Sequence, residues 1–75
     1  MVLYALPEGE AARIRCLAAE ADVRHRLGDL GFIPGTHITC LGRSPLGDPT
    51  AYLVRGAVIA LRNEDAEKVF VERDG

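Results

Sequence analysis

Hydrophobic and polar residues alternate along much of this chain, and alternation with a period of two predicts half-buried β-strands. Five segments show either this alternation or a short, continuous apolar run. They are residues 11–17, 36–43, 50–55, 57–61 and 69–71. Residues 3–6 are also apolar and are followed by a proline and a glycine, which predicts a strand or edge segment that ends in a turn. We expect about five strands in all.

One segment follows helical spacing instead. Val23, Leu27 and Leu30 recur at positions i, i+4 and i+7, which places them on one face of a helix. Asp22 is a good N-cap, so the helix is expected to cover residues 22–30. Leu27 and Leu30 are then expected to lie in the core.

A glycine lies inside this short helix, and a second helical turn follows later. Gly28 costs about 1 kcal/mol relative to alanine, and the expected reason is the close approach of another backbone, with the helix packed tightly on a sheet. Asn63 is expected to cap the second turn. Three acidic residues near its start are explained by the positive end of the helix dipole: Glu64, Asp65 and Glu67.

Residues 44–49, Ser-Pro-Leu-Gly-Asp-Pro, connect two of the predicted strands. Both prolines fix φ and remove an amide donor, while the glycine takes positive φ at no steric cost. This composition predicts a stiff loop. It fits both a hairpin connection that limits the entropy of the unfolded chain and a rigid, exposed loop that recognises a partner.

The pattern as a whole predicts a mainly β fold. Several short strands joined by tight turns cannot form two full sheets in 75 residues, so we expect a small, strongly bent barrel that closes its own edges. One short helix should flank this barrel, and a short helical turn should lie near the C-terminus. The length predicts a single domain, residues 1–75.

Charge and motifs exclude several classes of protein. Nine basic and eleven acidic residues give a net charge of −2, which provides no electrostatic footprint for nucleic acid. The chain has no apolar run near the length that spans a bilayer and no basic start typical of a signal peptide, so a cytoplasmic protein is expected. Phosphate-loop, zinc-protease and nucleophile-elbow motifs are absent, and we do not expect an enzyme.

The two cysteines each share a strand phase with an isoleucine. Cys16 follows Ile14 by two positions, and Cys40 follows Ile38 in the same way. Both thiols are therefore expected to point inward as small, buried, free groups, which is usual in a reducing cytosol. Together with the two histidines they form no recognisable zinc spacing.

Three groups of residues, in this order and at this spacing, resemble the FeoA family. They are Arg26-Leu27-x-x-Leu30-Gly31-x-x-Pro34-Gly35, then Pro45-Leu46-Gly47-Asp48-Pro49, then Ala60-Leu61-Arg62 with Ala66. The resemblance implies an SH3-like domain of bacterial ferrous iron transport. Six of these residues are expected to serve the fold more than a binding site: Leu27, Leu30, Gly31, Pro34, Gly35 and Leu61. At Thr50 the chain departs from the family pattern, where an aliphatic residue is commoner.

The resemblance also implies a function and a partner. The chain is expected to be a cytoplasmic accessory that contacts FeoB, the large ferrous iron permease with a GTP-binding cytoplasmic part. It would reach the membrane only through that partner and would need no cofactor. A similar domain forms the C-terminal module of iron-dependent repressors.

The expected contact surface is a cleft between the flanking helix and the barrel, with the proline loop as one wall. Arg24 and Arg26 would supply charged contacts and Leu46 an apolar tip. The complete set of expected contact residues is Arg24, Arg26, Pro45, Leu46, Gly47, Asp48 and Pro49.

Two other functions compete with this one. Asp22, His25 and Asp29 share a helix face, so His25 with an acidic neighbour is a candidate weak site for a divalent transition metal, ferrous iron or zinc. Two copies of the chain could share such a site. His37 is an alternative ligand. A peptide-binding module for proline-rich ligands is less favoured, since few aromatic residues are available to line a groove.

Overall fold

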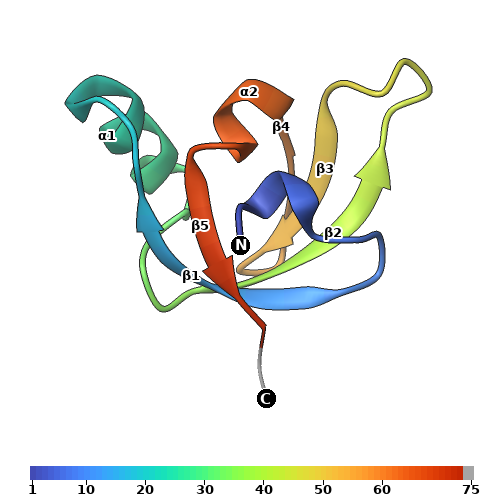
Figure 1. The fold of residues 1–75 in the computed structure, drawn as a ribbon, viewed down its shortest axis with the longest axis horizontal. Coiled ribbons are helices and arrows are strands. Elements are labelled where there is room, and N and C mark those ends of the chain that lie inside the picture. The colour runs from blue at the N-terminus through green and yellow to red at the C-terminus, as the bar shows by residue number, and fades with distance from the viewer. Residues whose placement is uncertain (74–75) are drawn as a thin grey trace.

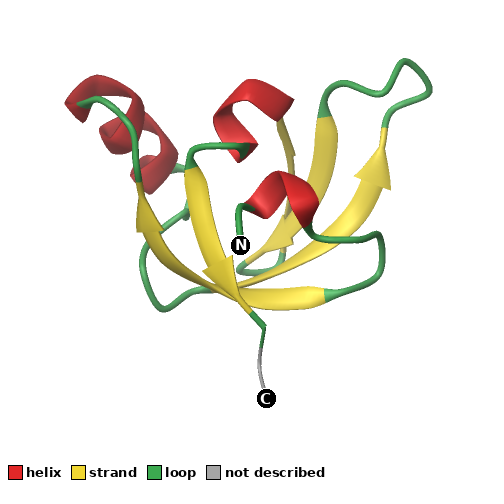
Figure 2. Ribbon diagram, in the orientation of Figure 1, coloured by secondary structure: helices red, strands yellow, loops and turns green. Residues whose placement is uncertain are grey.

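A computed structural model describes residues 1–73 as one five-stranded antiparallel sheet in the order β4-β3-β2-β1-β5 (Figure 1). The strands are β1 (Ala11–Leu17), β2 (His37–Arg43), β3 (Thr50–Val54), β4 (Ala57–Leu61) and β5 (Val69–Glu72). The helical segments are η1 (Leu3–Ala5), α1 (Ala21–Asp29) and α2 (Asn63–Ala66). Figure 2 shows them on the same side of the bent sheet. The mainly β fold, its five strands, the flanking helix and the late helical turn are confirmed.

Leu3–Ala5 form a 3-10 turn, so the prediction of a strand or edge segment over residues 3–6 is wrong. Leu3 and Leu6 are both buried in the core. A strand would place residues three apart on opposite faces, whereas a 3-10 turn places them on the same face. The main chain before the turn pairs with β5, because Val2 bridges Phe70 and the Val71 amide donates to the Met1 carbonyl at 2.8 Å.

The sheet does not close on itself among residues 1–73. Strands β4 and β5 are its two edges and are not paired with each other, so the expectation of a barrel that closes its own edges is wrong. The chain passes from β4 to β5 through α2, whose Ala66 is fully buried. This helical turn occupies the side on which a closed barrel would have strand pairing.

Helix α1 contacts the core through Leu27, its one buried side chain, and through the partly buried Val23. Leu30 is 43% exposed, so its expected place in the core is wrong. The physical reason is the turn at Gly31, whose φ of +106° reverses the chain so that Phe32 enters the core instead. The Phe32 amide donates to the Leu27 carbonyl at 3.0 Å and fixes this arrangement.

Two further expectations about α1 are wrong. Glu20 occupies the N-cap position without a side-chain cap bond, while Asp22 lies in the first turn. A Cβ on Gly28 would meet no atom within 4 Å, so no backbone approaches there. The helix lies on the sheet more loosely than its sequence predicts.

A bulge in β1 explains why the two cysteines differ in burial. Cys40 is buried as predicted, but Cys16 is exposed. The register between β1 and β5 shifts between Ile14 and Cys16, and one extra residue turns every later side chain of the strand to the other face. The inward phase predicted for Cys16 is therefore wrong.

The core contains the side chain of Tyr52, which lies on β3. Tyr52 is the largest fully buried side chain, and its burial raises the pKa of its phenol to about 12. The pairing of Cys40 with Tyr52 places these two buried residues opposite each other on adjacent strands.

Candidate protein-interaction surface

Residues 44–49 form the compact loop between β2 and β3. The Ser44 amide donates to the Pro49 carbonyl at 3.0 Å, and the Gly47 amide donates to the Ser44 carbonyl at 2.8 Å. Gly47 has a φ of +87°, as expected for its turn position. Leu46 is 94% exposed at the tip, so the loop presents one apolar side chain to solvent.

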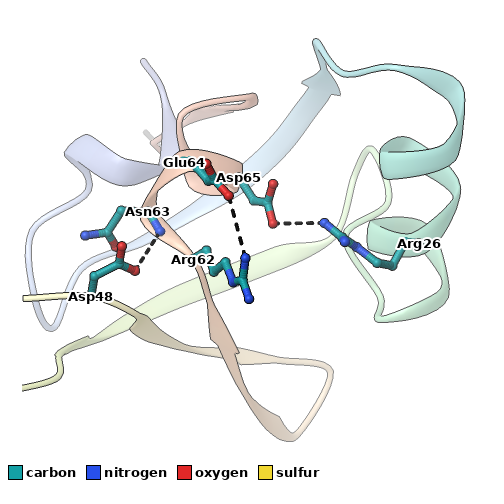
Figure 3. A network of polar contacts seen from close by, with 6 residues as sticks. All are labelled: Arg26, Asp48, Arg62, Asn63, Glu64 and Asp65. Carbon is teal, nitrogen blue, oxygen red and sulfur yellow. Dashed lines mark hydrogen bonds and ion pairs between the residues drawn. The ribbon is translucent and has the colours of Figure 1, made fainter.

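Asn63, the first residue of α2, holds this loop against the helix (Figure 3). The main-chain N–H of Asn63 donates to Asp48 Oδ1 at 3.0 Å, and its side-chain Nδ2 donates to the Gly47 carbonyl at 2.7 Å. The buried hydroxyl of Thr50 donates to Asn63 Oδ1 at 2.8 Å. We name this set of Gly47, Asp48, Thr50 and Asn63 the loop clamp.

The loop clamp changes how α2 is capped. Arg62, and not Asn63, occupies the N-cap position, and its side chain makes no cap hydrogen bond. Instead, the carboxylate of Asp48 accepts a hydrogen bond from the Asn63 main-chain N–H, one of the first-turn groups that have no partner within the helix. This position also suits the negative charge of the carboxylate. Thr50, which departs from the family pattern, is explained by its hydrogen bond to Asn63.

An ion pair connects α1 with α2. Arg26 Nη2 lies 2.9 Å from Asp65 Oδ2, and the Asp65 side chain is only 10% exposed. Asp65 lies in the first turn of α2, as predicted, and its carboxylate also pairs with Arg26 of α1. The two residues are 39 positions apart, so no local spacing indicates the contact.

Two adjoining hollows share the residues Ala60, Arg62 and Glu64. One, of about 580 Å³, extends to the loop at Asp48 and Pro49. The other, of about 280 Å³, extends to α1 and includes Arg26 and Leu30. We name the continuous surface the β4 groove, and its residues are Arg26, Leu27, Leu30, Asp48, Pro49, Ala60, Leu61, Arg62, Glu64 and Asp65.

The structure divides the residues that the sequence grouped in one cleft. Arg26, Asp48 and Pro49 all line the β4 groove. Arg24 lines a different, largely apolar hollow of about 400 Å³. That hollow lies between α1, the end of β1 and the turn after α1, and its other residues are Cys16, Leu17, Gly28, Phe32, Ile33 and Pro34.

The predicted metal ligands are only partly brought together. His25 Nε2 lies 3.9 Å from Asp29 Oδ1, and both side chains are largely exposed. Within residues 1–73, no three side chains of His, Cys, Asp or Glu are grouped so that they could hold a metal ion. His37 lies elsewhere, on β2, where its Nε2 is 3.4 Å from Arg13 Nη2.

No helix within residues 1–73 has both the length and the apolar character needed to cross a membrane.

A small, bent antiparallel sheet with exposed arginines and shallow grooves belongs to the class of small β domains that suit binding by surface contact. The family description of the FeoA domain matches residues 1–73. The chain therefore belongs to the FeoA family, which is involved in ferrous iron transport.

One curated relative joins two transport proteins in a single chain. It is the Fe(2+) transport protein A/Fe(2+) transporter FeoB fusion protein of Porphyromonas gingivalis, and it is 36% identical over 72 residues. The match covers 96% of this chain but only 8% of the fusion protein.

Solved structures of related proteins have the same fold. The FeoA protein of Chlorobium tepidum is 37% identical with a TM-score of 0.91, over 97% of this chain and 70% of that one. FeoA of Stenotrophomonas maltophilia, solved as a zinc complex and described as an SH3 domain protein, is 29% identical with a TM-score of 0.82, over 96% and 89% of the two chains. The predicted SH3-like fold is confirmed.

Proposed function

We propose that this chain is a cytoplasmic accessory of ferrous iron uptake that acts by contact with a FeoB-type permease, with residues 1–75 working as one domain. The observation that supports this most is the Porphyromonas gingivalis fusion, in which a FeoA part and FeoB share one chain. Covalent fusion gives two domains a high effective concentration. A separate chain achieves the same association through a binding surface.

The loop at residues 44–49 is the proposed centre of that surface. Leu46 is almost fully exposed, and large apolar side chains that fill a partner's pocket are typical binding anchors. The loop clamp holds the backbone beside it through Asn63. A loop that is already ordered loses little conformational entropy on binding.

Arg24 and Arg26 on α1 are proposed to extend the surface. Substitution of the two arginines by glutamate is expected to have different side effects on the fold. Arg26→Glu would place a second carboxylate beside Asp65, so it would disturb the fold as well as binding. Arg24 is an exposed residue at the rim of the hollow beside α1, and no ion pair of the described residues involves it. Arg24→Glu is therefore the cleaner test of a charged contact.

We expect the soluble GTP-binding domain of the permease to shift amide signals of residues 24–30 and 44–49 when it is titrated into the isotope-labelled protein. Leu46→Asp and Arg24→Glu should each weaken binding at least ten-fold. Leu41→Asp is the matched control, because Leu41 is also an exposed apolar residue but lies on β2, outside the described hollows. Full binding by folded Leu46→Asp and Arg24→Glu variants would contradict the proposed surface, and no shifts at all would contradict the contact function.

A second candidate function is metal response, supported by the zinc complex of Stenotrophomonas maltophilia FeoA. His25 and Asp29 could supply two ligands from one exposed helix face. Zinc is almost always four-coordinate, so the remaining ligands would come from water or from a second copy of the chain.

Zinc titration separates this function from contact alone. We expect Zn²⁺ to shift the signals of residues 22–29 and to raise the sedimentation coefficient, and we expect His25→Ala to abolish both changes. His37→Ala is the control and should respond like the unchanged protein. An unaltered zinc response of His25→Ala would refute a site at this histidine.

A further inference from the structure

One edge of the sheet carries unpaired main-chain groups. The turn between β3 and β4 has positive φ at both of its residues, +53° at Arg55 and +82° at Gly56, as in a two-residue type I′ hairpin. The pair that closes such a hairpin exchanges two hydrogen bonds, and bonded and non-bonded pairs then alternate. Val58 and Ala60 therefore point their N–H and C=O groups away from β3, and within residues 1–73 they have no other hydrogen-bond partner.

The other edge of the sheet is covered. Main-chain hydrogen bonds join Met1 with Val71 in both directions, at 3.0 and 2.8 Å, and Val2 forms a bridge with Phe70. Figure 1 shows the N-terminal segment beside β5. In the described chain, β4 thus remains as the edge without a neighbour.

The side chains of β4 give this edge no protection of their own. The strand is Ala-Val-Ile-Ala-Leu, without charge or proline, whereas natural edges usually carry such residues to prevent pairing. Val58 is 67% exposed and lies opposite Leu53, which is 38% exposed. A strand added here would gain main-chain hydrogen bonds and apolar contacts together.

There is also space for an added strand. Ala60 lies in the β4 groove, and the facing wall comes from Arg26 of α1 and from Leu30, the C-cap residue that follows this helix. A neighbouring strand lies about 4.8 Å away in a sheet, which places it inside this groove. Leu30, exposed although its spacing predicts a core residue, would contact the strand's apolar side chains.

The charges around β4 disfavour a second copy of the chain as the occupant. An antiparallel pair of β4 strands that matches Val58 with Ala60 of the other copy would place Arg55 of one copy opposite Asn63 and diagonally next to Arg62 of the other, at both ends. Like charges at such close cross-strand positions are destabilising. The same two arginines favour carboxylates, since the ion pair that Arg62 makes within residues 1–73 is a long one, 3.9 Å from exposed Glu64.

We propose that β4 binds an extended segment of a partner protein by β-strand addition, and that this segment is apolar in its middle and acidic at both ends. The main chain of Val58 and Ala60 would provide the hydrogen bonds, and Arg55 and Arg62 would pair with the two acidic ends. This inference rests on the proposed function, because it takes the partner to be the permease.

The probe is a synthetic peptide with blocked ends, Asp-Thr-Val-Thr-Val-Thr-Val-Asp, whose carboxylates match the spacing of Arg55 and Arg62. We expect it to slow hydrogen exchange of the Val58 and Ala60 amides at least ten-fold. The same peptide with lysine at both ends should have no effect. The Ala60→Pro variant removes one outward donor without breaking the ladder with β3, and it should reduce binding at least ten-fold.

The outcomes separate this inference from the contact function. Peptide binding without slowed exchange at Val58 and Ala60, or equal binding of the lysine peptide, would overturn strand addition. Binding of the permease domain that leaves these two amides in fast exchange would also overturn it while the contact function stands. Slowed exchange with the peptide, together with no binding of the permease domain, would support strand addition and refute the permease as partner. If Ala60→Pro does not fold, Arg55→Glu with Arg62→Glu provides the second test, because it should reverse the preference to the lysine peptide.

Discussion

Replacement of Leu27 by alanine is expected to lower the free energy of unfolding by about 2–5 kcal/mol, the usual cost of a large-to-small change in a core. Leu27 is fully buried and is the only buried side chain of α1. A small domain has a total stability of about 5–15 kcal/mol, so the variant should unfold at a much lower urea concentration. Urea titration followed by circular dichroism measures the difference.

Leu30→Ala is the matched control for this experiment. The same residue type is removed from the C-cap position that directly follows the same helix, but Leu30 is 43% exposed, so the expected loss is below about 1 kcal/mol. Equal losses for the two variants would contradict the observed burial of α1. They would favour instead the helix position expected from the spacing of both leucines.

Replacement of Asn63 by alanine is expected to cost about 2–4 kcal/mol, because two side-chain hydrogen bonds are lost and a buried hydroxyl is left without an acceptor. That hydroxyl belongs to Thr50, which is 1% exposed. The loop at residues 44–49 should also become mobile, since Gly47 loses its side-chain partner. Urea unfolding measures the first effect, and heteronuclear NOE values of the loop amides measure the second.

A double-mutant cycle tests whether the loop clamp acts as a unit. Thr50→Val keeps the shape of the side chain but removes the donor, so Asn63→Ala should cost less in this background. Additive losses from the two substitutions would show that Thr50 and Asn63 are not coupled. Unchanged NOE values in Asn63→Ala would show that the prolines and the hydrogen bonds within the loop keep it rigid without Asn63.

Strand positions could be predicted because they depend on neighbours two residues apart. The alternation in residues 11–17 identified β1, but it could not reveal the bulge that turns Cys16 outward, since the bulge depends on pairing with β5. The prediction that Leu30 lies in the core was wrong for a related reason. Helical spacing places it beside Leu27, while the reversal at Gly31 gives its place in the core to Phe32.

The candidate surface was predictable only where one segment forms it. The stiff loop with exposed Leu46 followed from its prolines and glycine. The β4 groove did not, because α1, the loop and α2 meet there from distant parts of the sequence. The pairing of Arg26 with Asp65 had no local signal for the same reason.

The arginines at the two ends of β4 also determine how the protein behaves at high concentration. An uncharged edge strand is a template for edge-to-edge aggregation, and charged residues that flank it act as gatekeepers. The repulsion between Arg55 and Arg62 of neighbouring molecules is screened by salt, with a Debye length of about 10 Å at 0.1 M. Raising the ionic strength should thus promote self-association at this edge and also weaken the binding of an acidic strand. At low salt we expect a dispersed protein that is competent to bind, and at high salt a colloidally unstable one.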